Sequence, residues 1–135
     1  MKYYAVIDTN VLVSAMLRWD SVPGRVLEHA FVGDIIPLLN EQVLKEYMEV
    51  LRRPKFQFDE EKINIIIDEI VKRGIFVDAE HTDEVLPDPN DRVVYEIVME
   101  KRKHDEAFLV TGNIKHFPIE SYIVTPREIL TILES

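Results

Sequence analysis

The sequence contains no cysteine and no long apolar run. Without cysteine, disulfides, thiolate zinc sites and cysteine nucleophiles are excluded, and this fits a reducing compartment such as the cytoplasm. No segment approaches the roughly 20 apolar residues that a membrane span needs. Asp8 also interrupts the one N-terminal stretch that could imitate a signal peptide. We therefore expect a soluble cytoplasmic protein with no membrane association.

Basic residues are scarce relative to acidic ones, 16 against 25, giving a formal net charge of −9. This balance argues against a nucleic-acid partner, because phosphate binding usually uses a basic face. A carboxylate site that binds divalent cations would remove the objection, since the metal ions supply local positive charge. Basic runs at 52–55 and 101–104 could line an anionic substrate's approach, although the second is more typical of a solvated helix end.

The length of 135 residues and the apolar content of 47% predict one globular domain over residues 1–135. Short β-like runs alternate with amphipathic helical runs, which is typical of a parallel sheet with helices on both faces, a three-layer α/β/α sandwich. We expect strands at 3–8, 35–39, 75–78, 107–111 and 122–125 and helices at 10–18, 24–32, 41–52, 60–73, 90–103 and 126–134.

Asp8 follows the first strand and precedes a helical run. In open α/β sheets, ligands bind at the carboxyl ends of the strands, so a site role is expected. Aspartate is also a good helix N-cap, and Asp8 alone does not separate capping from catalysis.

Glu46 is the acid that lies oddly in the helix at 41–52. We expect the sheet-facing side of this helix to consist of Leu44, Tyr47, Met48 and Leu51. Glu46 would then lie at the margin of that face. It is either a boundary residue whose stem covers apolar surface or a second acid of a site.

Two further groups of polar residues also have both a structural and a site interpretation. Asp88 and Asp91 lie at the start of a helix, where both could cap it. Capping suits Asp88 better, and Asp91 would be held at the mouth of the sheet. Thr111 and Asn113 end an apolar strand; they are either turn formers or site residues on the same edge as Asp8.

Four segments taken together, in order along nearly the whole chain, resemble a known family: Val6–Ala15, Glu46–Phe56, Pro87–Arg92 and Leu109–Pro118. The family is the PIN-domain nucleases, and within it the VapC-like toxins of prokaryotic toxin–antitoxin pairs. The resemblance implies that Asp8, Glu46 and Asp91 are the catalytic, metal-binding acids and that Asp88 is auxiliary. Groups that position the metal or substrate would be Thr9, Thr111, Asn113 and His116.

The implied activity is that of an endoribonuclease, hydrolysing RNA with a metal-activated water and leaving 5′-phosphate and 3′-hydroxyl ends. Carboxylates converging within about 5 Å would repel by a few kcal/mol per pair, so they need protons or cations. Oxygen ligands without cysteine favour Mg²⁺ or Mn²⁺ over zinc. The general family pattern often has aspartate where this chain has Asn113, so the sequence does not decide whether the site binds one metal ion or two.

A toxin-like protein implies three partners: RNA, a small antitoxin that covers the acidic groove, and a second copy in a homodimer. Two alternatives remain at this stage. One is a PIN-fold binding module without catalysis, for which Asn113 is the hint. The other is a receiver-like phosphotransfer domain. Two features weaken this alternative: it leaves Glu46 without a role, and this chain has no acid at the end of the central strand at 35–39.

Overall fold

The sheet is parallel throughout in the computed structural model, which describes residues 2–79 and 89–135, with the backbone alone at residues 89 and 90. Within this part of the chain the strand order is β3-β2-β1-β4-β5. The strands are β1 (Tyr3–Ile7), β2 (Ile35–Leu39), β3 (Ile75–Phe76), β4 (Ala107–Val110) and β5 (Ile123–Val124).

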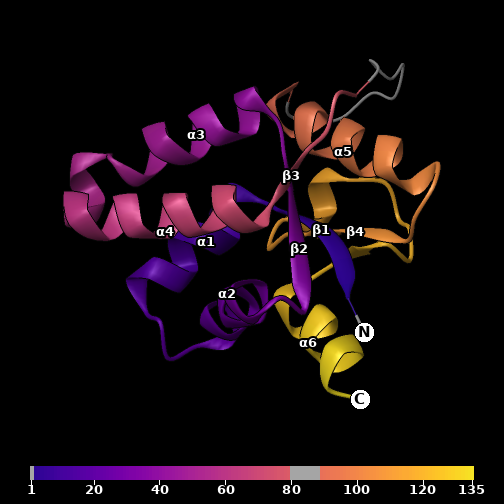
Figure 1. Cartoon of the computed structure of the whole chain (residues 1–135), viewed down its shortest axis with the longest axis horizontal. Coiled ribbons are helices and arrows are strands. Elements are labelled where there is room, and N and C mark those ends of the chain that lie inside the picture. The colour runs from indigo at the N-terminus through magenta and orange to yellow at the C-terminus, as the bar shows by residue number, and fades with distance from the viewer. Residues whose placement is uncertain (1, 80–88) are drawn as a thin grey trace.

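Helices cover both faces of this sheet, as Figure 1 shows: α5 lies on one side, and α2 and α6 lie on the other. α3 and α4 run side by side, with α3 contacting α5 and α4 contacting β2. The helices are α1 (Thr9–Leu17), α2 (Val22–Val32), α3 (Glu41–Leu51), α4 (Glu60–Arg73), α5 (Pro89–Arg102) and α6 (Pro126–Glu134), with 3₁₀ turns η1 (Pro54–Phe56) and η2 (Ile114–His116). The predicted three-layer α/β/α fold is confirmed, and the single domain stays a prediction.

No helix or strand boundary differs from the predicted one by more than two residues. The two 3₁₀ turns were not predicted, because a three-residue turn has no periodicity in the sequence. None of the helices in the described residues is long and apolar enough to cross a membrane.

The register of the central strands brings the predicted polar residues together. β1 and β4 pair with Ile7 opposite Val110, so Asp8 and Thr111 leave the sheet side by side. The Asp8 amide continues this pairing by donating to the Val110 carbonyl at 2.9 Å. The expectation that these residues share one edge is met.

The prediction for the sheet-facing side of α3 was partly wrong. The buried residues of this helix are Val43, Tyr47 and Leu51, whereas Leu44 and Met48 are half-buried on its outer side. The buried Tyr47 hydroxyl donates to the carbonyl of Ile7, the last residue of β1. This contact sets the rotation of α3 about its axis and turns Glu46 toward the end of β1.

A separate polar cluster joins α2 to α6. The His29 ring lies 2.8 Å from Asp34 through Nδ1 and 3.1 Å from Glu134 through Nε2. Glu134 also pairs with Arg25. Burial lowers the pKa of His29, but the hydrogen bonds to the two carboxylates together raise it by more, so the net shift is upward.

Candidate active site

Asp8 caps α1 and also faces a cleft, so capping does not prevent it from being part of a site. One carboxylate oxygen accepts the Thr9 amide at 2.9 Å. The other accepts the Asn10 side-chain amide at 3.0 Å and the Thr111 hydroxyl at 2.8 Å. Only 6% of Asp8 is exposed, which makes it an acid fixed in position by its donors.

The charge on Asp8 is not fully compensated by these donors. Burial raises the pKa of its carboxyl group, and the hydrogen bonds from Thr111, Thr9 and Asn10, with the nearby His116, lower it less. A buried carboxylate in this condition is stabilised by a proton or a cation. The site is therefore suited to binding positive charge.

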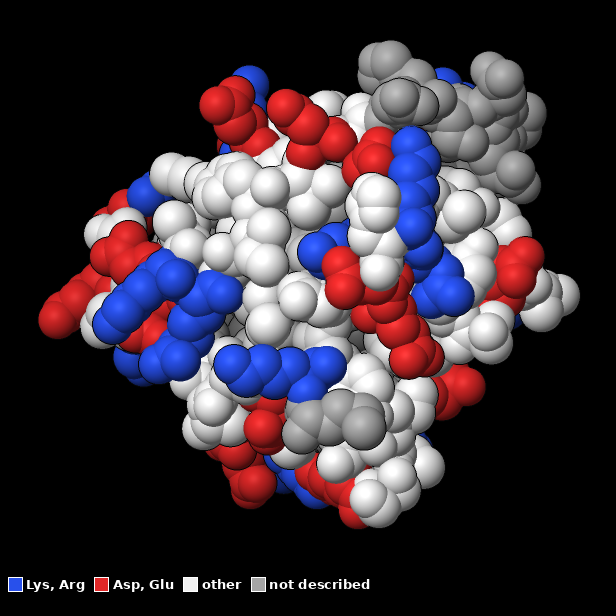
Figure 2. Space-filling view, turned by 45° about the vertical axis from the view of Figure 1, so that its right-hand side comes forward, with Lys and Arg blue, Asp and Glu red and all other residues white. Residues whose placement is uncertain are grey.

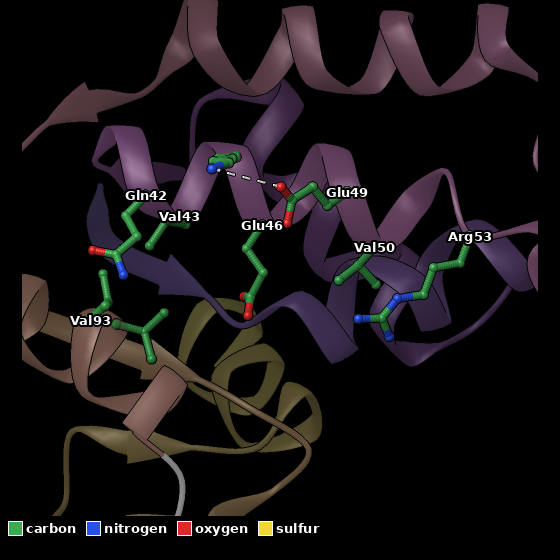
Figure 3. A pocket seen from close by; sticks show the side chains of 9 residues that line it. Gln42, Val43, Glu46, Glu49, Val50, Arg53 and Val93 are labelled. Carbon is green, nitrogen blue, oxygen red and sulfur yellow. Dashed lines mark ion pairs between the residues drawn. The ribbon is translucent and has the colours of Figure 1, made fainter.

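Glu46 reaches the same site from α3. Its Oε2 accepts a hydrogen bond from the Thr9 hydroxyl, so Thr9 contacts both acids, Asp8 through its backbone and Glu46 through its side chain. Figure 3 shows Glu46 pointing from α3 into a hollow, away from its helix neighbour Glu49. Glu46 therefore borders the same cleft as Asp8, in addition to lying at the margin of its helix's apolar face.

Asp91 enters from the first turn of α5. Its Oδ2 lies 3.1 Å from Nδ1 of His116, which stands on η2 beyond β4. The Asp91 carboxylate accepts a hydrogen bond from this nitrogen, which orients the imidazole ring and the carboxylate relative to one another. His116 therefore holds the third acid.

Asn10 is the site residue for which the sequence predicted no role. Its amide nitrogen donates to Asp8, and its oxygen accepts the Gly112 amide at 3.0 Å, joining α1 to the turn after β4. Thr111 completes this link by accepting the Asn113 amide at 3.0 Å. The signal available in the sequence was the position of Asn10, a polar residue directly before the apolar run that begins at Val11.

These residues line one cleft of about 440 Å³, which we call the acidic cleft. Its lining comprises Asp8, Thr9, Asn10, Val13, Ser14, Glu46, Val50, Arg53, Phe56, Asp91, Asn113 and His116. Thr111 is buried and reaches the site through its bond to Asp8. Asp88 lies outside the described residues.

The acids border the acidic cleft from three elements. Among residues 2–79 and 89–135, no three His, Cys, Asp or Glu side chains form a group ready to surround a metal ion. Each acid is instead bound to a donor group: Asp8 to Thr111, Glu46 to Thr9 and Asp91 to His116. The three acids would offer a metal ion only oxygen ligands, which are the ligands that Mg²⁺ and Mn²⁺ prefer.

Net charge does not prevent an anion from approaching. On the face shown in Figure 2, acidic and basic side chains are interspersed and do not form one continuous acidic surface. The acidic cleft itself has Arg53 and His116 in its lining.

Comparison with known proteins agrees with this arrangement. Residues 4–115 match the PIN domain, and the chain belongs to the PIN-domain family. Members of this family are generally nucleases that use divalent metals. The match excludes the receiver-like alternative.

The chain is also similar to an uncharacterised protein of the archaeon Methanocaldococcus jannaschii. The two are 25% identical over 116 residues, which cover 84% of this chain and 72% of that protein.

Proposed function

We propose that this PIN domain is a divalent-metal-dependent endoribonuclease. The observation that carries the proposal is that Asp8, Glu46 and Asp91, from three elements, line one cleft at the carboxyl edge of a parallel sheet. These three acids would hold Mg²⁺ or Mn²⁺. When bound, the metal ion would activate water and offset negative charge on a phosphodiester.

The chain's own residues prepare this site by fixing the acids. Three donors orient Asp8, the Thr9 hydroxyl orients Glu46, and His116 orients Asp91. Such supporting bonds hold ligands in place and strengthen metal sites. Asn113 adds a neutral amide to the cleft lining, suited to a substrate or metal-bound water. No covalent intermediate is required, and the expected products carry 5′-phosphate and 3′-hydroxyl ends.

We also propose that the protein is the toxin of a VapC-like toxin–antitoxin pair and acts as a homodimer. This rests on the sequence resemblance. A cleft with three carboxylates is electrostatically complementary to an arginine or lysine of an antitoxin, which supports inhibition by direct insertion.

The test is cleavage of a mixed pool of single-stranded and structured RNA, with Mn²⁺, Mg²⁺ or EDTA. We expect cleavage with metal that is lost with EDTA and in Asp8→Asn and Glu46→Gln. Glu41→Gln is the matched control, because Glu41 is an exposed acid of the same helix and does not line the acidic cleft. Thermal melting must show that each variant is folded.

Cleavage by Asp8→Asn at the wild-type rate would identify a contaminating nuclease. RNA binding without cleavage by folded wild-type protein would instead favour the inactive binding module.

A further inference from the structure

Arg53 stands at the mouth of the acidic cleft with no ion pair among the described residues. It differs in this from its neighbour Arg52, whose guanidinium binds Glu60 at 2.8 and 3.0 Å. Figure 3 shows the Arg53 guanidinium extending toward the same hollow as Glu46, with Val50 between them. A cation is thus available beside the acids.

The local chain explains why two consecutive arginines have different surroundings. Arg53 precedes Pro54 and has extended backbone angles, φ −62° and ψ 130°, as a residue before proline prefers. α3 ends here, so Arg52 remains on the side of α4 while Arg53 turns toward the acidic cleft. The difference is built into the backbone.

A second hollow of about 290 Å³ adjoins the acidic cleft between α3 and α5, and we call it the flanking groove. The two share Glu46, Val50 and Arg53. The flanking groove is lined by Gln42, Val43, Lys45, Glu46, Glu49, Val50, Arg53, Val93 and Val94. An RNA strand that extends from the three acids into the flanking groove would pass Arg53.

Phe56 gives the cleft an aromatic wall near Arg53. It is half-buried, and its ring stacks on Phe58 with centroids 5.4 Å apart and planes at 15°. Lys55 Nζ lies 5.1 Å from the Phe56 centroid. Cations beside a held aromatic ring are the combination with which proteins bind single-stranded nucleic acid, phosphate on the cation and base on the ring.

We propose that Arg53 binds the phosphate next to the scissile one and that Phe56 contacts the base or ribose of that nucleotide. This inference rests on the proposed nuclease function and adds two substrate-binding residues to it. Arg53 and Phe56 act in substrate binding, apart from the acids.

The test is single-turnover cleavage with Mn²⁺ of an end-labelled single strand of about 12 nucleotides. Arg53→Gln should raise the half-saturating protein concentration about tenfold and leave the rate at saturation within about twofold. The slope of log affinity against log salt should become shallower by about 0.7, the value for one lost phosphate contact on a single strand.

Arg52→Gln is the control for charge. Phe76→Leu is the control for Phe56→Leu, because Phe76 is exposed and lines neither the acidic cleft nor the flanking groove. We expect weaker binding in Arg53→Gln and Phe56→Leu and unchanged binding in the two control variants. Far-ultraviolet circular dichroism and melting curves verify folding, and Arg53, being exposed, is not expected to affect it.

Three results would overturn the inference while leaving the nuclease intact. These are wild-type affinity in Arg53→Gln, equal weakening in Arg52→Gln and Arg53→Gln, or wild-type affinity in Phe56→Leu. Absence of metal-dependent cleavage by wild-type protein overturns the proposed function and this inference with it.

Discussion

Thr9→Val should separate the positioning of Glu46 from the folding of the domain. Thr9 is 7% exposed, and its hydroxyl donates to Glu46 while its amide donates to Asp8. Valine keeps the shape and the amide and removes only the hydroxyl. The Glu46 carboxylate then loses the donor that holds it in the acidic cleft.

The magnitude follows from the kind of bond. A hydrogen bond to a charged group contributes about 1.5–3 kcal/mol, and water replaces part of it at the half-buried Glu46. A net loss of about 1.4 kcal/mol corresponds to an approximately tenfold fall in kcat/KM for RNA cleavage. With 135 residues, 1 kcal/mol of stability is about 3.5 °C in Tm, so we expect a Tm change of no more than about 5 °C.

The assay is metal-dependent RNA cleavage by wild type, Thr9→Val and Thr9→Ser, each with a melting curve. Serine restores the hydroxyl, so Thr9→Ser should recover activity to within about twofold of wild type. Wild-type activity in Thr9→Val, or failure of Thr9→Ser to recover it, would refute a positioning role.

Three further predictions concern stability. Tyr47→Phe removes the buried hydroxyl that donates to the Ile7 carbonyl, and should lower the free energy of unfolding by about 1–2 kcal/mol in urea titrations. Gly24→Ala places a Cβ 1.8 Å from the Trp19 carbonyl oxygen, and should lower Tm by about 4–10 °C in calorimetry. The raised pKa of His29 implies stabilisation that is complete below its unfolded value of 6.5 and lost as pH rises through the higher folded value. Melting from about pH 6 to 8 should therefore show a decline in wild type that His29→Gln lacks; parallel curves, or unchanged stability in the first two variants, would contradict these assignments.

The site could be predicted from the sequence where it depends on strand ends. Parallel strands place their carboxyl ends on one edge, so Asp8 and Thr111 could be brought together without knowing the strand order. The register of Ile7 with Val110 then makes them hydrogen-bonded neighbours.

The rotation of α3 could not be predicted in the same way. Its apolar residues allow a sheet-facing stripe that includes Leu44 and Met48 or one that includes Val43, and Tyr47 lies in both. The choice depends on tertiary contacts such as the hydrogen bond of the Tyr47 hydroxyl to the Ile7 carbonyl. The Thr9–Glu46 bond spans 37 residues and likewise has no local signal.

The central claim is that Asp8, Glu46 and Asp91 bind a divalent cation together, and Mn²⁺ titration followed by electron paramagnetic resonance tests it most directly. We expect Asp8→Asn, Glu46→Gln and Asp91→Asn each to weaken Mn²⁺ binding by at least about tenfold. Glu49→Gln, with its carboxylate paired to Lys45, should bind as wild type does. Wild-type Mn²⁺ affinity in all three folded acid variants, or no binding by the wild-type protein, would contradict the account.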